Sequence, residues 1–133
     1  RVVVDAMRNE ARDLLKRSGP EEALARIKEA LELSKQYSSL FHTAMCRVTY
    51  ATIRIEIMDS LSAEEQDVAH REISEEFNGI IAEFEKMGQD LGLAKVLQTY
   101  GAYLTAQGVS RGKTLELRAQ KIFARCNRTA LEE

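Results

Sequence analysis

The stretch 97–104 constrains the fold of this chain more than any other. In this stretch Leu97, Tyr100 and Leu104 are spaced about one helical turn apart, so they lie along one side of a helix. Gly101 lies among them, and a residue without a Cβ atom lets the backbone of a second helix come close. The spacing therefore predicts a helix that is crossed closely at Gly101, with large apolar groups filling the space around the contact.

Apolar residues recur at helical spacing along nearly the whole chain, and no β-alternating run of useful length interrupts them. One proline and seven glycines leave long stretches free to be helical. The predicted helices span residues 3–17, 20–37, 40–58, 62–87, 91–107 and 111–127. Because short connections imply antiparallel neighbours, we expect an all-α fold in which helices pair in order. The expected hairpins lie at about 1–37, 40–87 and 91–127, stacked as an α-α superhelix in one domain, 1–133.

Turn and capping residues mark the ends of these helices. Ser62 followed by Glu65 forms a capping box, in which the hydroxyl and the carboxylate each accept a hydrogen bond from an unpaired backbone N–H. Gly19 suits the end of the first helix, and Pro20 suits the first turn of the second. Further turns are predicted at 37–39, 88–90 and 108–110.

The third predicted helix is apolar around most of its circumference, which is typical of an interior helix. Only a narrow stripe of this helix is polar, formed by Thr43, Arg47, Tyr50 and Arg54. We therefore expect this helix in the middle of the array, with the polar stripe facing a groove.

The formal net charge of −2 argues against a surface that binds nucleic acid generally. Cys46 and Cys126 lie in no CxxC motif or Cys/His cluster, so we expect reduced thiols in a cytoplasmic protein. A run of about eighteen apolar residues, which a membrane span needs, is missing from the sequence. The start at Arg1, without Met or a signal-peptide pattern, predicts a piece of a longer protein.

The chain resembles the tetratricopeptide repeat family. The stretch 97–104 has the spacing of its first-helix signature W-x2-L-G-x2-Y, and a shift of fifty residues places Tyr50 on Tyr100 and Ala51 on Gly101. The matching residues are Leu97, Tyr100, Gly101 and Leu104 for the first helix of a repeat, and Ala23, Ile27 and Ala30 for the second. Residues 81–108 are similar to the longer repeats of large bacterial signalling and regulatory proteins.

The sequence also departs from the family pattern. Repeat spacings are about forty and fifty residues rather than thirty-four. Glu10 stands where a leucine is typical, Arg47 and Arg54 stand where large apolar groups are expected, and the closing proline is absent from every repeat. A generic α-α superhelix is therefore the alternative.

In the tetratricopeptide fold the first helices of each pair line a concave groove, so the resemblance implies that their polar residues contact a partner. The implied groove residues are Arg8, Arg12, Lys16, Thr43, Arg47, Tyr50, Arg54, Lys95 and Gln98. Arginine binds carboxylates through two parallel hydrogen bonds, which makes an acidic or C-terminal peptide the expected ligand. The alternative is a set of solvated basic residues without a specific ligand.

Metal binding and catalysis are not expected. His42 with Cys46, and His70 with Glu72 and Glu76, are weak candidates for the three or four ligands that a metal needs. The carboxylates of 62–87 alternate with apolar residues as on a solvated face, and the sequence has no P-loop, GxGxxG or nucleophile elbow.

We therefore expect a non-catalytic protein–protein interaction module of a signalling or regulatory protein, without a cofactor. The expected partner is a protein or peptide rather than a membrane, and the acidic fourth helix counts against nucleic acid. The alternatives are an oligomerisation domain, which would make the chain a homo-oligomer, or a ligand-sensing domain of a larger ATPase, kinase or transcriptional regulator.

Overall fold

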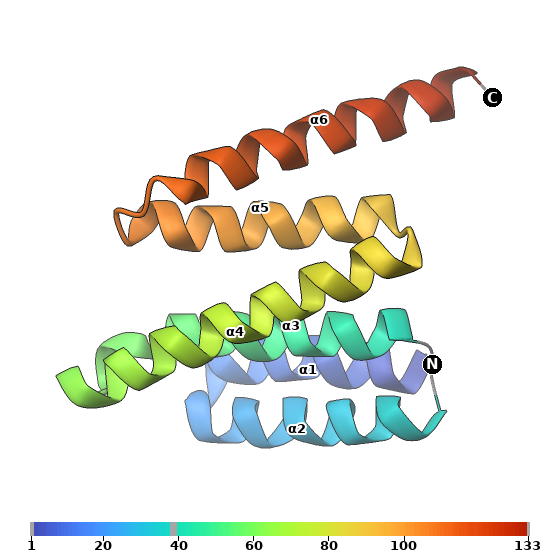
Figure 1. The fold of residues 1–133 in the computed structure, drawn as a ribbon. Coiled ribbons are helices and arrows are strands. Elements are labelled where there is room, and N and C mark those ends of the chain that lie inside the picture. The colour runs from blue at the N-terminus through green and yellow to red at the C-terminus, as the bar shows by residue number, and fades with distance from the viewer. Residues whose placement is uncertain (1, 38–39, 133) are drawn as a thin grey trace. The chain divides into compact units, whose positions relative to one another are not determined.

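The computed structural model describes residues 2–37 and 40–132, and within them all regular structure is helical (Figure 1). The elements are α1 (Val2–Arg17), α2 (Pro20–Tyr37), α3 (Leu40–Glu56), the 3₁₀ helix η1 (Met58–Ser60), α4 (Ala63–Met87), α5 (Asp90–Ala106) and α6 (Arg111–Glu132). The predicted all-α class is confirmed.

Most predicted helix ends lie within one or two residues of the observed ones. Two predictions were wrong at a helix end: α3 gives way to the tighter η1 after Glu56, and α6 continues to Glu132 rather than ending at Asn127. The first difference reflects the serine-rich turn that follows, because 3₁₀ turns are frequent where a helix ends. The turn predicted at 37–39 falls largely on residues 38 and 39, which lie outside the described residues.

The chain divides into two compact units, residues 1–76 and 77–133, and the boundary falls inside α4. The first unit contains α1, α2, α3, η1 and the first half of α4. The second contains the rest of α4 with α5 and α6. The single domain and the superhelical stacking of three hairpins stay predictions.

In the first unit α1 packs on α2, and both contact α3. Alanines provide the close contacts, since Ala11, Ala23 and Ala30 are completely buried. Larger side chains fill the space between them, and burying one such aliphatic group stabilises the fold by about 1.5–3 kcal/mol. The core residues are Val4, Met7, Ala11, Ala23, Ile27, Ala30, Cys46 and Ile53.

Polar contacts at the surface of the α1–α2 hairpin add to the contacts of its buried core. Arg26 of α2 donates hydrogen bonds to Glu10 of α1 at 3.1 Å and to Glu29 at 2.8 Å. Glu10 therefore accepts a hydrogen bond from Arg26 of α2. The tetratricopeptide pattern would place a leucine at this position.

In the second unit α5 is the most deeply buried helix, and α6 packs antiparallel to it (Figure 1). The ring of Phe77 stacks on Tyr100 with centroids 4.9 Å apart. A Cβ atom built on Gly101 would lie 2.9 Å from the carbonyl oxygen of Gly112 on α6. The close crossing predicted at Gly101 is therefore confirmed.

The predicted caps are also present. Ser62 N–H donates to Glu65 Oε1 at 3.0 Å, and Glu65 N–H donates to Ser62 Oγ at 3.2 Å, which is the capping box at the start of α4. Gly108 ends α5 with φ +78°, a conformation that glycine adopts without steric cost. There Val109 N–H donates to Leu104 O at 2.9 Å, and this bond satisfies a carbonyl group in the last turn of α5.

Candidate functional site

A groove runs between α3 and the first half of α4, within the first unit. One part is a cavity of about 320 Å³ lined by Tyr50, Ala51, Arg54, Glu72, Ile73, Glu75 and Glu76. A second hollow of about 440 Å³ is lined by Arg54, Leu61, Glu64, Glu65, Val68 and Ala69. Because Arg54 lines both, the two hollows adjoin. We call this surface the α3–α4 groove.

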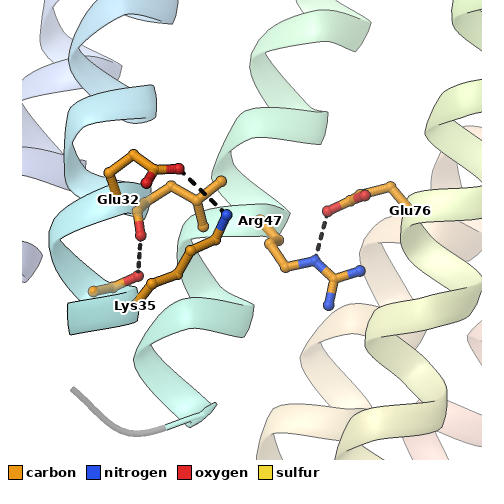
Figure 2. Close-up of polar contacts among 6 residues, drawn as sticks. Glu32, Lys35, Arg47 and Glu76 are labelled. Carbon is orange, nitrogen blue, oxygen red and sulfur yellow. Dashed lines mark hydrogen bonds and ion pairs between the residues drawn. The ribbon is translucent and has the colours of Figure 1, made fainter. Parts of the chain in front are cut away.

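Two ion pairs connect the walls of the α3–α4 groove. Arg47 Nε donates to Glu76 Oε1 at 2.6 Å, and Figure 2 shows this side chain reaching from α3 to α4. Arg54 Nη2 donates to Glu72 Oε1 at 2.9 Å. Charge-assisted bonds of this kind are stronger than bonds between neutral groups, although partial exposure reduces their net value. The pairs therefore bridge α3 and α4 at two points along the groove.

Tyr50 completes this part of the groove. The guanidinium carbon of Arg54 lies 5.8 Å from the centroid of the Tyr50 ring, within the range of a cation–π contact. Arg54 is thus held by a carboxylate and an aromatic ring together. By contrast, Figure 2 shows Lys35 bonded to Glu32 of its own helix, a local pair on the exposed face of α2.

The lining of the α3–α4 groove is acidic. Five glutamates line it, against the single cation of Arg54. Glu72 is neutralised by Arg54 and Glu76 by Arg47, whereas Glu64 and Glu75 are exposed and form no ion pair with any other described residue. The arginines that were expected to select acidic groups are therefore already bonded to glutamates of α4.

Sequence reasoning placed the glutamates of α4 on a solvated face and missed their part in this groove. The order of the two pairs is that of an antiparallel hairpin, because Arg54 and Glu72 lie nearer the turn than Arg47 and Glu76. Distance from the turn does not identify the partners, since Arg54 is two residues from the end of α3 and Glu72 is nine residues from the start of α4.

The other predicted groove residues are distributed over three helices. Thr43 is half-buried on α3, and Arg8 is half-buried on α1, 3.9 Å from Asp5. The remaining four are exposed: Arg12 and Lys16 on α1, and Lys95 and Gln98 on α5. The last two belong to the second unit. A single concave surface formed by all nine residues stays a prediction.

A Cys–His–Asp set joins α1 and α3 but offers no exposed thiol. His42 Nε2 lies 3.8 Å from Asp5 Oδ2. Cys46 is completely buried, and this burial raises the pKa of its thiol, although the nearby charge of Arg8 acts in the opposite direction. Since the thiolate is the nucleophile, this cysteine is suited to packing rather than to reaction.

Within residues 2–37 and 40–132, no three His, Cys, Asp or Glu side chains are arranged so that they could hold a metal ion. Cys126, the second cysteine, is a half-buried free thiol on α6.

Comparison with known proteins finds no matching family model, no similar curated protein and no similar solved structure. The likeness to tetratricopeptide repeats therefore stays a prediction. None of the described helices is both long and apolar enough to cross a bilayer.

Proposed function

We propose that this chain is a non-catalytic protein–protein interaction module and that the α3–α4 groove is its docking surface. The observation that carries the proposal is an apolar patch with a charged rim. Val68 is 48% exposed, the half-buried Leu61 lines the groove with it, and the buried Ala69 lies beneath them. Interfaces between proteins commonly combine an apolar centre with polar groups around it.

The groove is also preorganised. The bonds Arg47–Glu76 and Arg54–Glu72 hold its two walls together before any partner arrives. A preformed surface loses less conformational entropy on binding than a flexible one. As part of the proposal, we infer that the hairpins are of the tetratricopeptide type. The close crossing at Gly101 supports that inference.

The charges of the α3–α4 groove favour a basic partner over an acidic one. An acidic peptide would have to displace Glu72 or Glu76 from its arginine. A basic segment would instead meet the exposed carboxylates of Glu64 and Glu75 directly. Opposite charges across an interface increase the association rate and exclude partners of the wrong sign.

Fluorescence anisotropy with two labelled amphipathic peptides, one basic and one acidic, tests this function. We expect the basic peptide to bind, with an affinity that falls as salt is added. In Glu64→Gln with Glu75→Gln the affinity for the basic peptide should fall several-fold, because the exposed carboxylates that meet it are lost while Arg47 and Arg54 stay bonded to α4.

The matched control is Asp13→Asn with Glu21→Gln, which removes the same charge from exposed positions of α1 and α2 outside the groove. Circular dichroism verifies that both variants are folded. If neither peptide binds, the proposed function is wrong. If the two variants change the affinity equally, the groove is not the docking surface.

A further inference from the structure

Two exposed stripes in this chain complement each other in charge and in spacing. Each stripe has an aliphatic residue midway between two like charges, and successive members are four positions apart in the sequence. The acidic stripe consists of Glu64, Val68 and Glu72 on α4, and the basic stripe of Lys113, Leu117 and Lys121 on α6. Residues four apart lie on the same face of a helix, so each stripe is continuous over about 12 Å.

The aliphatic residues of both stripes face solvent. Val68 is 48% exposed and Leu117 is 58% exposed, which places both among the few large apolar side chains that are not covered. When α6 of one copy lies along α4 of another, Val68 can meet Leu117 while one lysine meets Glu64. The other lysine can meet Glu72, whose side chain is 53% exposed although its Oε1 accepts from Arg54. The matching distances within the stripes allow all three contacts together.

The lysines of the basic stripe are available for such contacts. Arg118 and Arg125 on the same helix pair with carboxylates of their own unit, Glu85 at 3.6 Å and Asp90 at 3.5 Å. Lys113 and Lys121, in contrast, are exposed and form no ion pair within the described part of the chain. The charge difference extends beyond the stripes, since α4 has eight acidic and two basic residues and α6 has six basic and two acidic.

We propose that this chain self-associates by docking the basic stripe of one copy on the acidic stripe of another. The proposal rests on the proposed function, because Glu64, Val68 and Glu72 line the α3–α4 groove. The two stripes differ, so the contact is heterologous. Each copy carries both stripes, and association therefore either closes into a small oligomer or continues as a chain.

Sedimentation velocity of the full chain tests the proposal. The acidic-stripe variant is Glu64→Lys with Val68→Lys, and the basic-stripe variant is Leu117→Glu with Lys121→Glu. All four positions are exposed, so both variants keep the core intact. The matched controls, Asp13→Lys and Lys28→Glu, reverse exposed charges on α1 and α2.

We expect the wild-type chain to assemble as its concentration rises and to dissociate in about 1 M salt. Each stripe variant should self-associate more than about tenfold more weakly, and the controls should match the wild type. An equimolar mixture of the two variants should form a heterodimer, because it restores one intact pair of stripes.

The proposal of self-association by this contact is wrong if the wild type stays monomeric at every concentration. It is equally wrong if the stripe variants assemble as the wild type does. It is also wrong if mixing the variants restores nothing. A monomeric wild type that still binds the labelled basic peptide leaves the proposed function standing. A monomeric wild type that binds neither peptide removes both proposals.

Discussion

The backbones of Gly101 and Gly112 approach each other so closely that neither position has room for a Cβ atom. One built on Gly112 would lie 2.6 Å from the carbonyl oxygen of Gly101, and one built on Gly101 would lie 2.9 Å from that of Gly112. Cβ atoms essentially never come within 3.0 Å of another heavy atom. This pair of glycines therefore sets how closely α5 and α6 cross.

We predict that Gly112→Ala destabilises the second unit by about 1–2 kcal/mol. In a helix that no second helix crosses, the same change would raise the free energy of unfolding by about 1 kcal/mol. A decrease therefore indicates that α5 leaves no room for the new Cβ atom. The new Cβ would meet backbone of Thr105 and Gly101, which cannot rotate away as a side chain can. Urea denaturation followed by circular dichroism measures the change.

The matched control for the glycine pair is Ala102→Gly, at an exposed position of α5, the helix that contains Gly101. It should lower stability by helix propensity alone, by about 1 kcal/mol. A Gly112→Ala variant more stable than the wild type would contradict the close crossing.

Removal of the capping box is expected to destabilise α4. Ser62→Ala deletes the oxygen that accepts from Glu65 N–H, and loss of such a cap costs about 1 kcal/mol. Ser18→Ala replaces an exposed serine in the turn after α1 and serves as the control. Equal free energies of unfolding for the two variants would show that the cap contributes nothing.

The stabilising effect of Glu65 should depend on pH. Hydrogen bonds from the backbone and side chain of Ser62 lower the pKa of this carboxyl below its ordinary value of 4.5. A lowered pKa in the folded state means that the stabilisation is fully present above pH 4.5 and is lost as pH falls through the folded pKa. The stability difference between wild type and Glu65→Gln should therefore shrink on acidification. A difference that stays constant down to pH 3 would contradict this assignment.

The two cysteines should differ strongly in reactivity. Cys46 is completely buried with a raised pKa, whereas Cys126 is half-buried. With iodoacetamide at pH 8, we expect Cys46 to be alkylated at least about a hundredfold more slowly, because it reacts only after the first unit opens. Mass spectrometry of the two cysteine peptides measures both rates. In urea, where both thiols are exposed, the rates should converge, and equal rates without urea would contradict the burial of Cys46.

Local features of this fold were predictable because their causes are local. The period of apolar residues is enough to predict which residues form a helix such as α2. The capping box of Ser62 and Glu65 needs only a spacing of three residues. The positive φ of Gly108 follows from the same short-range rules.

The candidate site was only half predictable. The polar stripe of α3 drew attention to Arg47 and Arg54, but not to the glutamates that they bond. Glu76 lies 29 residues from Arg47, and Glu72 lies 18 residues from Arg54. Periodicity within each helix describes which face a residue occupies, and it does not identify which residue of another helix lies opposite.

The order of residues along the chain was enough to predict that it is helical, where most of its helices begin and end, and that a second helix passes close to Gly101. These properties depend on propensity, capping and the absence of a single Cβ atom, all of which act over a few residues. The packed helices were needed to show that Gly112 is the residue that meets Gly101, and that the arginines of α3 are neutralised by α4. Those outcomes depend on the register between helices, which is set by packing and charge summed along the whole contact.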